Sequence, residues 1–253
     1  MSKWTWAAAS CRGTSHLRNS TRIQDAFQCC LNKTNNDIFI AIVADGAGSS
    51  LMGGQGASVL SRCIRNNAQT YFQQAREMPT DDVLKTWIDF AREQLLIAAT
   101  NRQLLVKDFA TTLVCAISSA AETIIIHIGD GCAVVKNAET CSWETASWPS
   151  HGEYASTTFF VTDDPYPRVN ISRFSKTISA VALFSDGLER LALDFAVKQP
   201  HQAFFNSVSR AVFASSAAGR DDQLSRHLSR FLDSNEVNSR TDDDKTIVIA
   251  VTR

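Results

Sequence analysis

The sequence lacks the features that mark several large classes of protein. No apolar run approaches the roughly 20 residues that a membrane-spanning helix needs. The N-terminal stretch MSKWTWAAAS has one lysine and too short an apolar part for an export signal. Low-complexity segments and repeats of solenoid period are also missing. We therefore expect a cytoplasmic protein that does not bind membranes.

The seven cysteines form no C-x-x-C pair and are odd in number. A zinc site or a disulfide framework would need paired spacings. Cys63 and Cys115 lie within apolar runs, where a free thiol behaves as a small hydrophobic group. The pattern predicts structural cysteines in a reducing compartment.

An excess of positive charge is missing too. The chain has 25 lysines and arginines against 26 acids, a formal net charge of −1, which argues against nucleic acid as a partner. With 253 residues, 44% hydrophobic and 20% charged, it can bury a large core. Because no stretch reads as a linker, we expect a single domain over residues 1–253.

The apolar pattern predicts many short strands and two pairs of helices. Continuous runs such as IFIAIV are typical of strands buried on both faces. The expected strands are Trp4–Ser10, Phe27–Leu31, Ile38–Val43, Thr111–Ile117, Thr123–Ile128, Ala133–Lys136, Thr158–Thr162, Ile171–Phe174, Ala180–Phe184 and Thr246–Val251.

Helical spacing of apolar residues predicts helices around Ala57–Phe72, Leu84–Ala98, Gln202–Ala214 and Asp222–Leu232. Thr80 is placed to cap the second of them. Asn137–Arg168 is irregular and predicts a long excursion, where we expect substrate selection. This element order favours an α+β fold with antiparallel sheets and helices packed outside them.

Aspartates recur where predicted strands begin or end. Asp25 and Asp243 come just before a strand, Asp45 and Asp186 come just after one, and Asp130 lies in a tight turn between two strands. Each has an ordinary explanation by itself, because aspartate beside glycine is common in turns. Asp186 could cap a helix, Asp130-Gly131 could close a hairpin, and Asp242–Asp244 could be a solvated turn.

Taken together, the acids predict a metal site. Strand ends that meet at one edge would bring the carboxylates into one cleft, where they would repel one another and raise their own pKa values. Mg²⁺ and Mn²⁺ prefer such all-oxygen shells. Gly46 would leave its backbone carbonyl free to approach the same ion. A phosphate-binding loop is excluded, because GAGSSLMGGQG has no G-K-[ST] and Leu51 stands where a third glycine is needed.

Seven segments in order resemble the motifs of type 2C protein phosphatases, the metal-dependent PPM family, and in particular a small bacterial subgroup. They are RGTSHLRNSTRIQDAF, VADGAGS…GGQGA, ATTLVCAI, IHIGDGCAVV, GEYASTTFFVT, LFSDGLERL and DDDKTIVIA, and they extend over nearly the whole chain.

The resemblance implies a four-layer α-β-β-α sandwich, two central antiparallel sheets flanked by helix pairs. It implies two Mg²⁺ or Mn²⁺ ions and a possible third. Asp45 would bridge the ions, Gly46 would offer its carbonyl, Asp186 and Asp243 would complete one site, and Asp25 would serve the second. Asp130 would match the acid near a weaker third metal.

The implied reaction is hydrolysis of phosphoserine and phosphothreonine in proteins by a hydroxide held between two ions, without a phospho-enzyme intermediate. Phosphorylated proteins and a cognate serine/threonine kinase system would be the partners, and we expect a monomer.

The chain departs from the family pattern at several positions. Ala47 stands where eukaryotic members carry a histidine proposed as general acid, and His16 is the candidate replacement. Ser20 stands where an arginine often binds substrate phosphate, and Arg22 could supply that guanidinium instead.

Two further departures concern acids. Gln24 stands where many members have a glutamate, and Arg190 where an acid is common. These two positions leave the binuclear core intact, and the exact metal stoichiometry stays open.

Two other functions stay open. One is a catalytically weak phosphoprotein-binding or regulatory module that keeps the fold, which Ala47 favours. The other is a different metal-dependent hydrolase such as a nuclease, which the lack of a basic patch disfavours.

Overall fold

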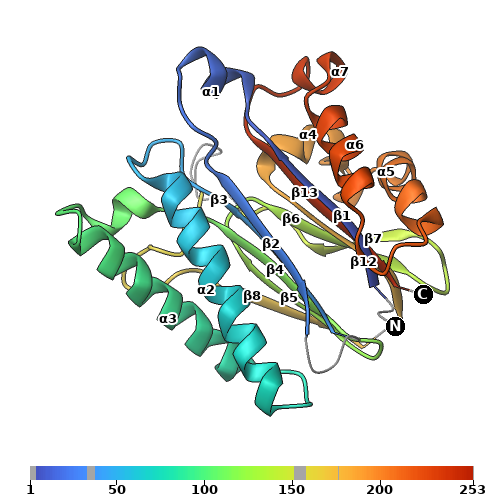
Figure 1. Ribbon diagram of the computed structural model, residues 1–253, viewed down its shortest axis with the longest axis horizontal. Coiled ribbons are helices and arrows are strands. Elements are labelled where there is room, and N and C mark those ends of the chain that lie inside the picture. The colour runs from blue at the N-terminus through green and yellow to red at the C-terminus, as the bar shows by residue number, and fades with distance from the viewer. Residues whose placement is uncertain (1–3, 33–37, 151–157, 176, 253) are drawn as a thin grey trace.

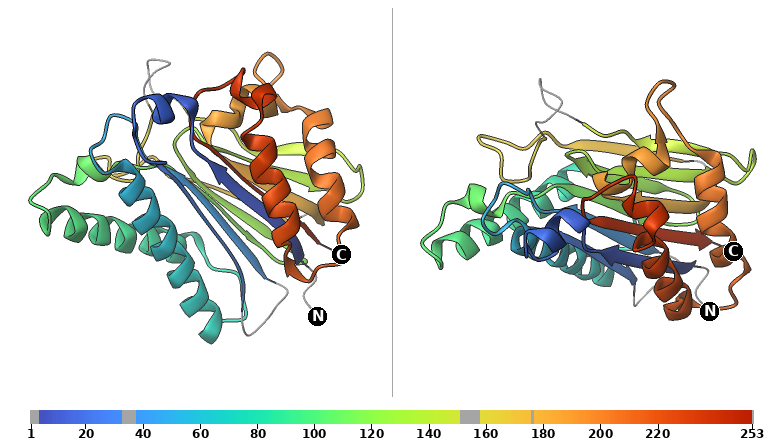
Figure 2. Two further views of the ribbon diagram at one scale, coloured as in Figure 1. Left: turned by 45° about the horizontal axis from the view of Figure 1, so that its top comes forward. Right: turned by 90° about the horizontal axis from the view of Figure 1, so that it is seen from above.

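Two β-sheets lie face to face, and helices cover the outer face of each. The computed structural model describes residues 4–32, 38–150, 158–175 and 177–252. In Figure 1 and Figure 2, α2 and α3 lie on one side of the paired sheets, and α5 and α6 lie on the other. The predicted α-β-β-α sandwich is confirmed.

Sheet A has the strand order β12-β1-β13-β9-β6-β7, and sheet B has the order β2-β3-β4-β5-β8. In sheet A the strands are β12 (Gly219–Arg220), β1 (Trp4–Cys11), β13 (Lys245–Thr252), β9 (Ile178–Phe184), β6 (Cys132–Asn137) and β7 (Trp143–Ser147). In sheet B they are β2 (Asp25–Leu31), β3 (Phe39–Asp45), β4 (Leu113–Ser118), β5 (Thr123–Ile128) and β8 (Asn170–Phe174). Neighbours pair antiparallel except for the two-residue parallel contact of β12 with β1.

The long helices are α2 (Gly53–Gln74) and α3 (Asp81–Thr100) on sheet B, and α5 (Gln202–Ala214) and α6 (Asp222–Leu232) on sheet A. Short elements connect them: α1 (Thr14–Arg18), η1 (Val106–Phe109), η2 (Asp186–Leu188), α4 (Glu189–Ala192), α7 (Asn235–Asn238) and the ribbon β10 (Leu193–Asp194) with β11 (Gln199–Pro200). The side chain of Thr80 caps α3 by accepting the N–H of Val83, as the sequence predicted.

The core forms three layers, which explains the continuous apolar strands. Along β3, Ile40 and Ile42 face α2 and α3, while Phe39 and Ala41 face the other sheet. Both faces of the strand are therefore removed from water. Phe39 lies in the layer between the sheets, with its ring 5.2 Å from that of Trp4.

The chain passes from sheet B to sheet A through the turn at Gly129. This residue has φ +107°, a left-handed conformation that glycine adopts without strain. Because β5 and β6 belong to different sheets, Asp130-Gly131 is not the loop of a hairpin. Asp130 instead lies in the connection between the two sheets.

Two parts of the strand prediction were wrong. Thr158–Thr162 forms no strand: Thr158 makes a single bridge, and the N–H of Val161 donates to the carbonyl of Thr111 from within a turn. The excursion expected over Asn137–Arg168 contains β7, whose Trp143 packs on Phe205. The sequence analysis missed β7 because polar residues such as Glu144 obscure the alternation of apolar and polar side chains that marks a strand.

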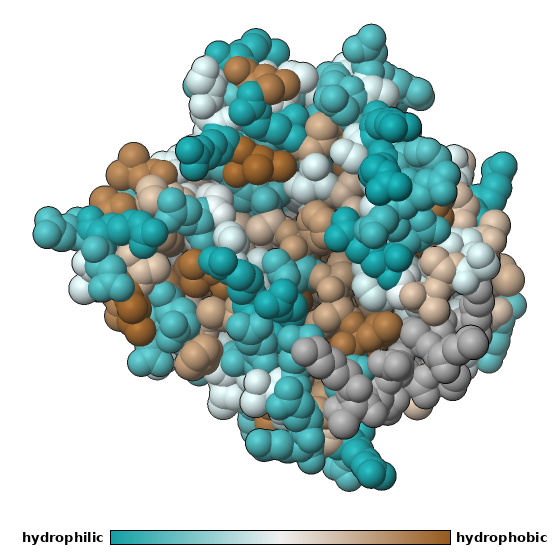
Figure 3. Space-filling model, viewed as in Figure 1, coloured by the Kyte–Doolittle hydropathy of each residue, from teal (hydrophilic) through white to brown (hydrophobic). Residues whose placement is uncertain are grey.

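Some large hydrophobic side chains remain at the surface, with Leu51 at 74% exposure and Leu105 at 61%. On the face drawn in Figure 3, hydrophobic residues occur in several separate places among hydrophilic ones. Such scatter is ordinary for globular proteins. Over the described ranges, no helix is long and apolar enough to cross a bilayer.

The layer between the sheets should carry much of the stability. Phe39→Ala removes a fully buried ring and should lower the free energy of unfolding by about 3–5 kcal/mol. Phe90→Ala is the matched control, because the Phe90 ring on α3 is 46% exposed and its loss should cost about 1 kcal/mol or less. Urea unfolding followed by circular dichroism measures both. Equal losses in the two variants would contradict this description of the core.

Candidate metal centre

The aspartates at the strand ends meet at one end of the sandwich. Antiparallel pairing of β2 with β3 sets Asp25 directly opposite Asp45. In sheet A, β9 ends just before Asp186, and its antiparallel neighbour β13 begins just after Asp243. The pairing of the strands therefore places all four residues at the same edge.

Three of the carboxylates form a compact group. Asp45, Asp130 and Asp186 each offer an oxygen, and these oxygens lie within 4.8 Å of one another. They line a cleft of about 530 Å³, whose wall also includes His16 and Asp243. The group brings together both sheets and the turn that connects them.

Asp25 lies behind this group and is buried. Its Oδ2 accepts a hydrogen bond from the Ser185 hydroxyl at 2.7 Å. Burial, together with the charge of Asp244, raises the pKa of Asp25 to about 6. Asp25 therefore resists ionisation at the position where it faces Asp45.

Burial and mutual repulsion raise the pKa of the neighbouring acids as well. The pKa of Asp45 is well above its usual range, first because the group is buried and then because Asp25 and Asp186 lie close by. Burial and the charges of Asp130 and Asp243 raise the pKa of Asp186 to about 8. Burial also raises the pKa of Asp243.

Several carboxylate oxygens in this group have no internal partner. Within the described part of the chain, Oδ1 of Asp25, Asp130 and Asp186 is buried without a hydrogen-bond donor. Buried polar atoms are nearly always satisfied, so an unpartnered set indicates a missing ligand. Oxygens with raised pKa values at one point fit a hard divalent cation.

The backbone around Asp45 is held rigidly. The carbonyl of Asp45 accepts a hydrogen bond from the backbone N–H of Thr112 at 2.8 Å and another from the hydroxyl of Thr111 at 2.9 Å. A Cβ on Gly46 would lie 2.1 Å from the backbone of Gly53. Position 46 must therefore be glycine so that the start of α2 can pack against it, a reason that sequence inspection did not give.

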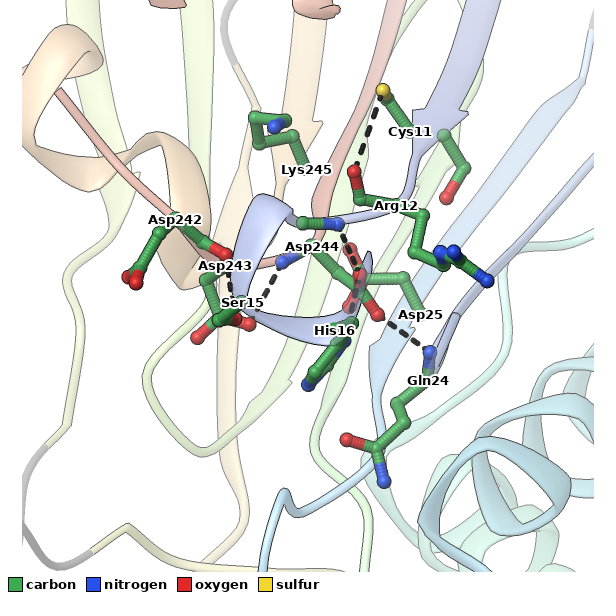
Figure 4. Close-up of polar contacts among 12 residues, drawn as sticks. Cys11, Arg12, Ser15, His16, Gln24, Asp25, Asp242, Asp243, Asp244 and Lys245 are labelled. Atoms are coloured by element: carbon green, nitrogen blue, oxygen red, sulfur yellow. Dashed lines mark hydrogen bonds and ion pairs between the residues drawn. The ribbon is translucent and has the colours of Figure 1, made fainter. Parts of the chain in front are cut away.

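Asp244 and its contacts were missed by the sequence analysis. The side chain is buried, and it accepts hydrogen bonds from the N–H groups of Gly13 and Gln24, each at 2.6 Å. His16 Nδ1 lies 2.9 Å from Asp244 Oδ1 (Figure 4). Only Asp242 behaves as the solvated acid expected of this turn, in an exposed ion pair with Arg18.

Other partners of the acids were also missed. Ser185 holds Asp25, and the hydroxyl of Thr158 donates a hydrogen bond to Asp130 Oδ2. The N-cap of η2 is Ser185, and no side-chain capping bond is made, so Asp186 does not serve as a helix cap.

Of the GEYASTTFFVT segment, residues 151–157 lie outside the described residues.

The basic residues singled out in the sequence lie beside the cleft. Arg22 is exposed and lines a neighbouring groove, which shares Gln24 with the cleft. Arg190 lines another groove, which shares Asp186 and Asp243 with it. The described lining of the cleft itself includes no arginine or lysine, and Ala47 contributes only a methyl group there.

Comparison with known proteins identifies the family. A model described as protein phosphatase 2C matches residues 12–233. The chain is 36% identical over 255 residues to serine/threonine-protein phosphatase 3 of Escherichia coli (strain K12), with 98% of each chain covered. The chain therefore belongs to the protein phosphatase 2C family, as the resemblance of its motifs predicted.

Solved structures agree on the fold. PppA of Pseudomonas aeruginosa, described as a key regulatory component of T6SS, has a TM-score of 0.66 at 18% identity, with 100% of this chain and 99% of that chain covered. Stp1 of Staphylococcus aureus, a serine/threonine phosphatase, has a TM-score of 0.62 at 17% identity, with 100% and 96% covered. The family is metal-dependent, and the acidic group of this chain fits that requirement.

The acids predict an unusual pH dependence in the metal-free protein. Their pKa values are raised above the ordinary 3.8, so the folded chain keeps protons that the unfolded chain releases. The free energy of unfolding should therefore fall as pH rises from about 4 toward about 8. Asp186→Asn should weaken this decline and stabilise the metal-free protein at pH 8.

Urea unfolding in EDTA between pH 5 and 8 measures this effect. Asp89→Asn, an exposed aspartate on α3, is the control and should retain the wild-type slope. A variant Asp186→Asn that is less stable than wild type at pH 8 without metal would contradict the repulsion argument.

Proposed function

We propose that the protein removes phosphate from phosphoserine and phosphothreonine residues of other proteins. The observation that carries the proposal is the group Asp45, Asp130 and Asp186, whose oxygens converge within 4.8 Å in a chain of the protein phosphatase 2C family. The specificity for serine and threonine is taken from the relative in Escherichia coli.

We assign the carboxylates to Mn²⁺ or Mg²⁺, with two ions and possible room for a third. Asp45 would serve both of the first two ions, and Asp186, Asp243 and the carbonyl of Gly46 would complete the site of one of them. Asp25 would serve the second ion, and Asp130 would serve the third. When bound, the ions would activate a water as the nucleophile near neutral pH and would offset charge on the phosphoryl oxygens.

The chain's own groups have separate tasks in this proposal. Asp25 and Asp45 hold their carboxylates opposite one another across β2 and β3. His16, on the cleft wall, donates a proton to the departing alkoxide. Arg22 contacts the substrate from the neighbouring groove, where its guanidinium can bind phosphate or acidic groups.

The cellular setting follows from this role. We propose a monomeric cytoplasmic enzyme that opposes a serine/threonine kinase system and binds neither nucleic acid nor membranes. The balance of 25 basic and 26 acidic residues supports the absence of nucleic acid as a partner.

A phosphoprotein-binding module with weak activity is the second candidate. The described lining of the cleft has no arginine or lysine to hold the phosphoryl group, and Ala47 cannot donate a proton. The acidic group argues against this candidate. Keeping several carboxylates close together costs free energy through their mutual repulsion, and a module that binds no metal gains nothing that would offset this cost.

Metal-dependent release of phosphate tests the function. With Mn²⁺, the wild type should release phosphate from a phosphothreonine peptide, and EDTA should abolish the release. Asp186→Asn removes a ligand charge and should lower kcat by about 100-fold or more. The exposed control Asp89→Asn should behave as wild type.

Phosphate release is measured as the formation of free inorganic phosphate over time. If the wild type binds the phosphopeptide but shows no turnover with either Mn²⁺ or Mg²⁺, the binding module is the correct function. If Asp186→Asn retains wild-type turnover, the acidic group is not the reaction centre.

A further inference from the structure

One buried carboxylate joins three segments that are distant in sequence. Asp244, 2% exposed, precedes β13 and accepts hydrogen bonds from the backbone at Gly13 and at Gln24. Gly13 is the N-cap of α1, and Gln24 directly precedes Asp25 on β2. Asp244 therefore fixes the segment 13–24 at both ends. Figure 4 shows Asp244 among His16, Gln24 and Asp25, and His16 and Gln24 also line the acidic cleft.

That segment carries His16, and Asp244 faces its ring. Nδ1 of His16 lies 2.9 Å from Asp244 Oδ1, and the His16 side chain is 15% exposed. The ring is close enough for an ion pair, although it is not aligned for a good hydrogen bond without substrate. Such bonds in catalytic sites often align only in the substrate complex.

The contact sets the orientation of the ring. Nδ1 is held on the side of Asp244, at ion-pair distance but without an aligned hydrogen bond. Nε2 lies on the opposite side of the ring, away from Asp244, and His16 belongs to the cleft wall. A carboxylate beside a histidine orients its ring, as in other acid–base sites.

The composition of the cleft singles out His16 as the proton donor. The described lining includes no lysine or arginine, and its other ionisable groups are the aspartates, which the proposed function assigns to the ions. His16 is therefore the imidazole on this wall that can carry a proton to the substrate. A serine or threonine alkoxide is a poor leaving group and needs such a proton.

We propose that Asp244 is a positioning residue that holds His16 with Nε2 toward the cleft, where His16 protonates the leaving oxygen of the substrate. The inference rests on the proposed function. As the phosphorus–oxygen bond breaks, its electron pair stays on the seryl or threonyl oxygen, which takes the proton from Nε2 of the imidazolium. Attacking hydroxide supplies the new bond to phosphorus, and solvent returns the proton to His16.

Leaving-group dependence tests the pair. The probes are a phosphothreonine peptide, whose alkoxide needs a proton, and p-nitrophenyl phosphate, whose phenolate leaves without one. His16→Gln and Asp244→Asn should each lower kcat on the peptide by about 100-fold, within the usual range for general acid catalysis. On p-nitrophenyl phosphate His16→Gln should lose far less than on the peptide, because a phenolate leaves without a proton. Asp244→Asn should show the same difference between the two substrates, on top of any loss that comes from its contacts with Gly13 and Gln24.

A double variant separates positioning from scaffolding. If Asp244 acts through His16, the double variant should be no slower on the peptide than His16→Gln alone, because the two effects are not additive. Asp242→Asn is the matched control, an exposed aspartate two residues away that pairs with Arg18, and it should match wild type on both substrates.

The results of this experiment distinguish a failure of this inference from a failure of the proposed function. If wild type turns over neither substrate, the proposed function fails and this inference fails with it. If wild type is active and His16→Gln keeps its peptide turnover, or loses both substrates equally, this inference is overturned together with the role given to His16, while the metal-dependent phosphatase activity stands. Should Asp244→Asn melt below the assay temperature, His16→Gln decides, because it leaves the contacts of Asp244 with Gly13 and Gln24 intact.

Discussion

Repulsion between buried carboxylates is the constraint on which the rest of this structure depends. Asp25 is buried, Asp45 and Asp186 are half-buried, and the loss of solvent and the nearby carboxylates both raise their pKa values. In an isolated chain such a group opposes folding near neutral pH. In the function proposed above, a divalent cation would offset this repulsion with charge of the opposite sign. The same ligand would then both stabilise the acidic end of the sandwich and serve its reaction.

The remainder of the fold holds this group in place. Antiparallel pairing in each sheet sets the acids at one edge, and the layer around Phe39 locks the two sheets together. Gly46 lets α2 pack against the loop that follows Asp45. Asp244 attaches the segment that carries His16 to the same edge. The paired strands and the Asp244 contacts thus hold the acidic side chains and His16 in place.

Local signals in the sequence were sufficient for most of the elements. Apolar runs gave the strands from β1 to β6, and the spacing of Leu84, Trp87 and Ile88 gave α3. Acids next to predicted strands indicated the metal-site candidates, because strand ends share an edge.

Contacts between distant segments carry no local signal. The bonds of Asp244 to Gly13 and Gln24 span more than two hundred residues, and the fit of Gly46 against Gly53 depends on how α2 docks. Val161 misled the strand prediction because a buried turn has the same apolar pattern as a strand.

The most direct test is to locate the metal. Crystals soaked in Mn²⁺ and measured at the manganese absorption edge should show anomalous peaks in contact with Asp45 and Asp186. The account predicts two ions roughly 3.5–4 Å apart, the separation typical of two-metal hydrolytic sites. Peaks found elsewhere, or an acidic group that stays empty at saturating Mn²⁺, would contradict the claim that a cation offsets the repulsion between these carboxylates.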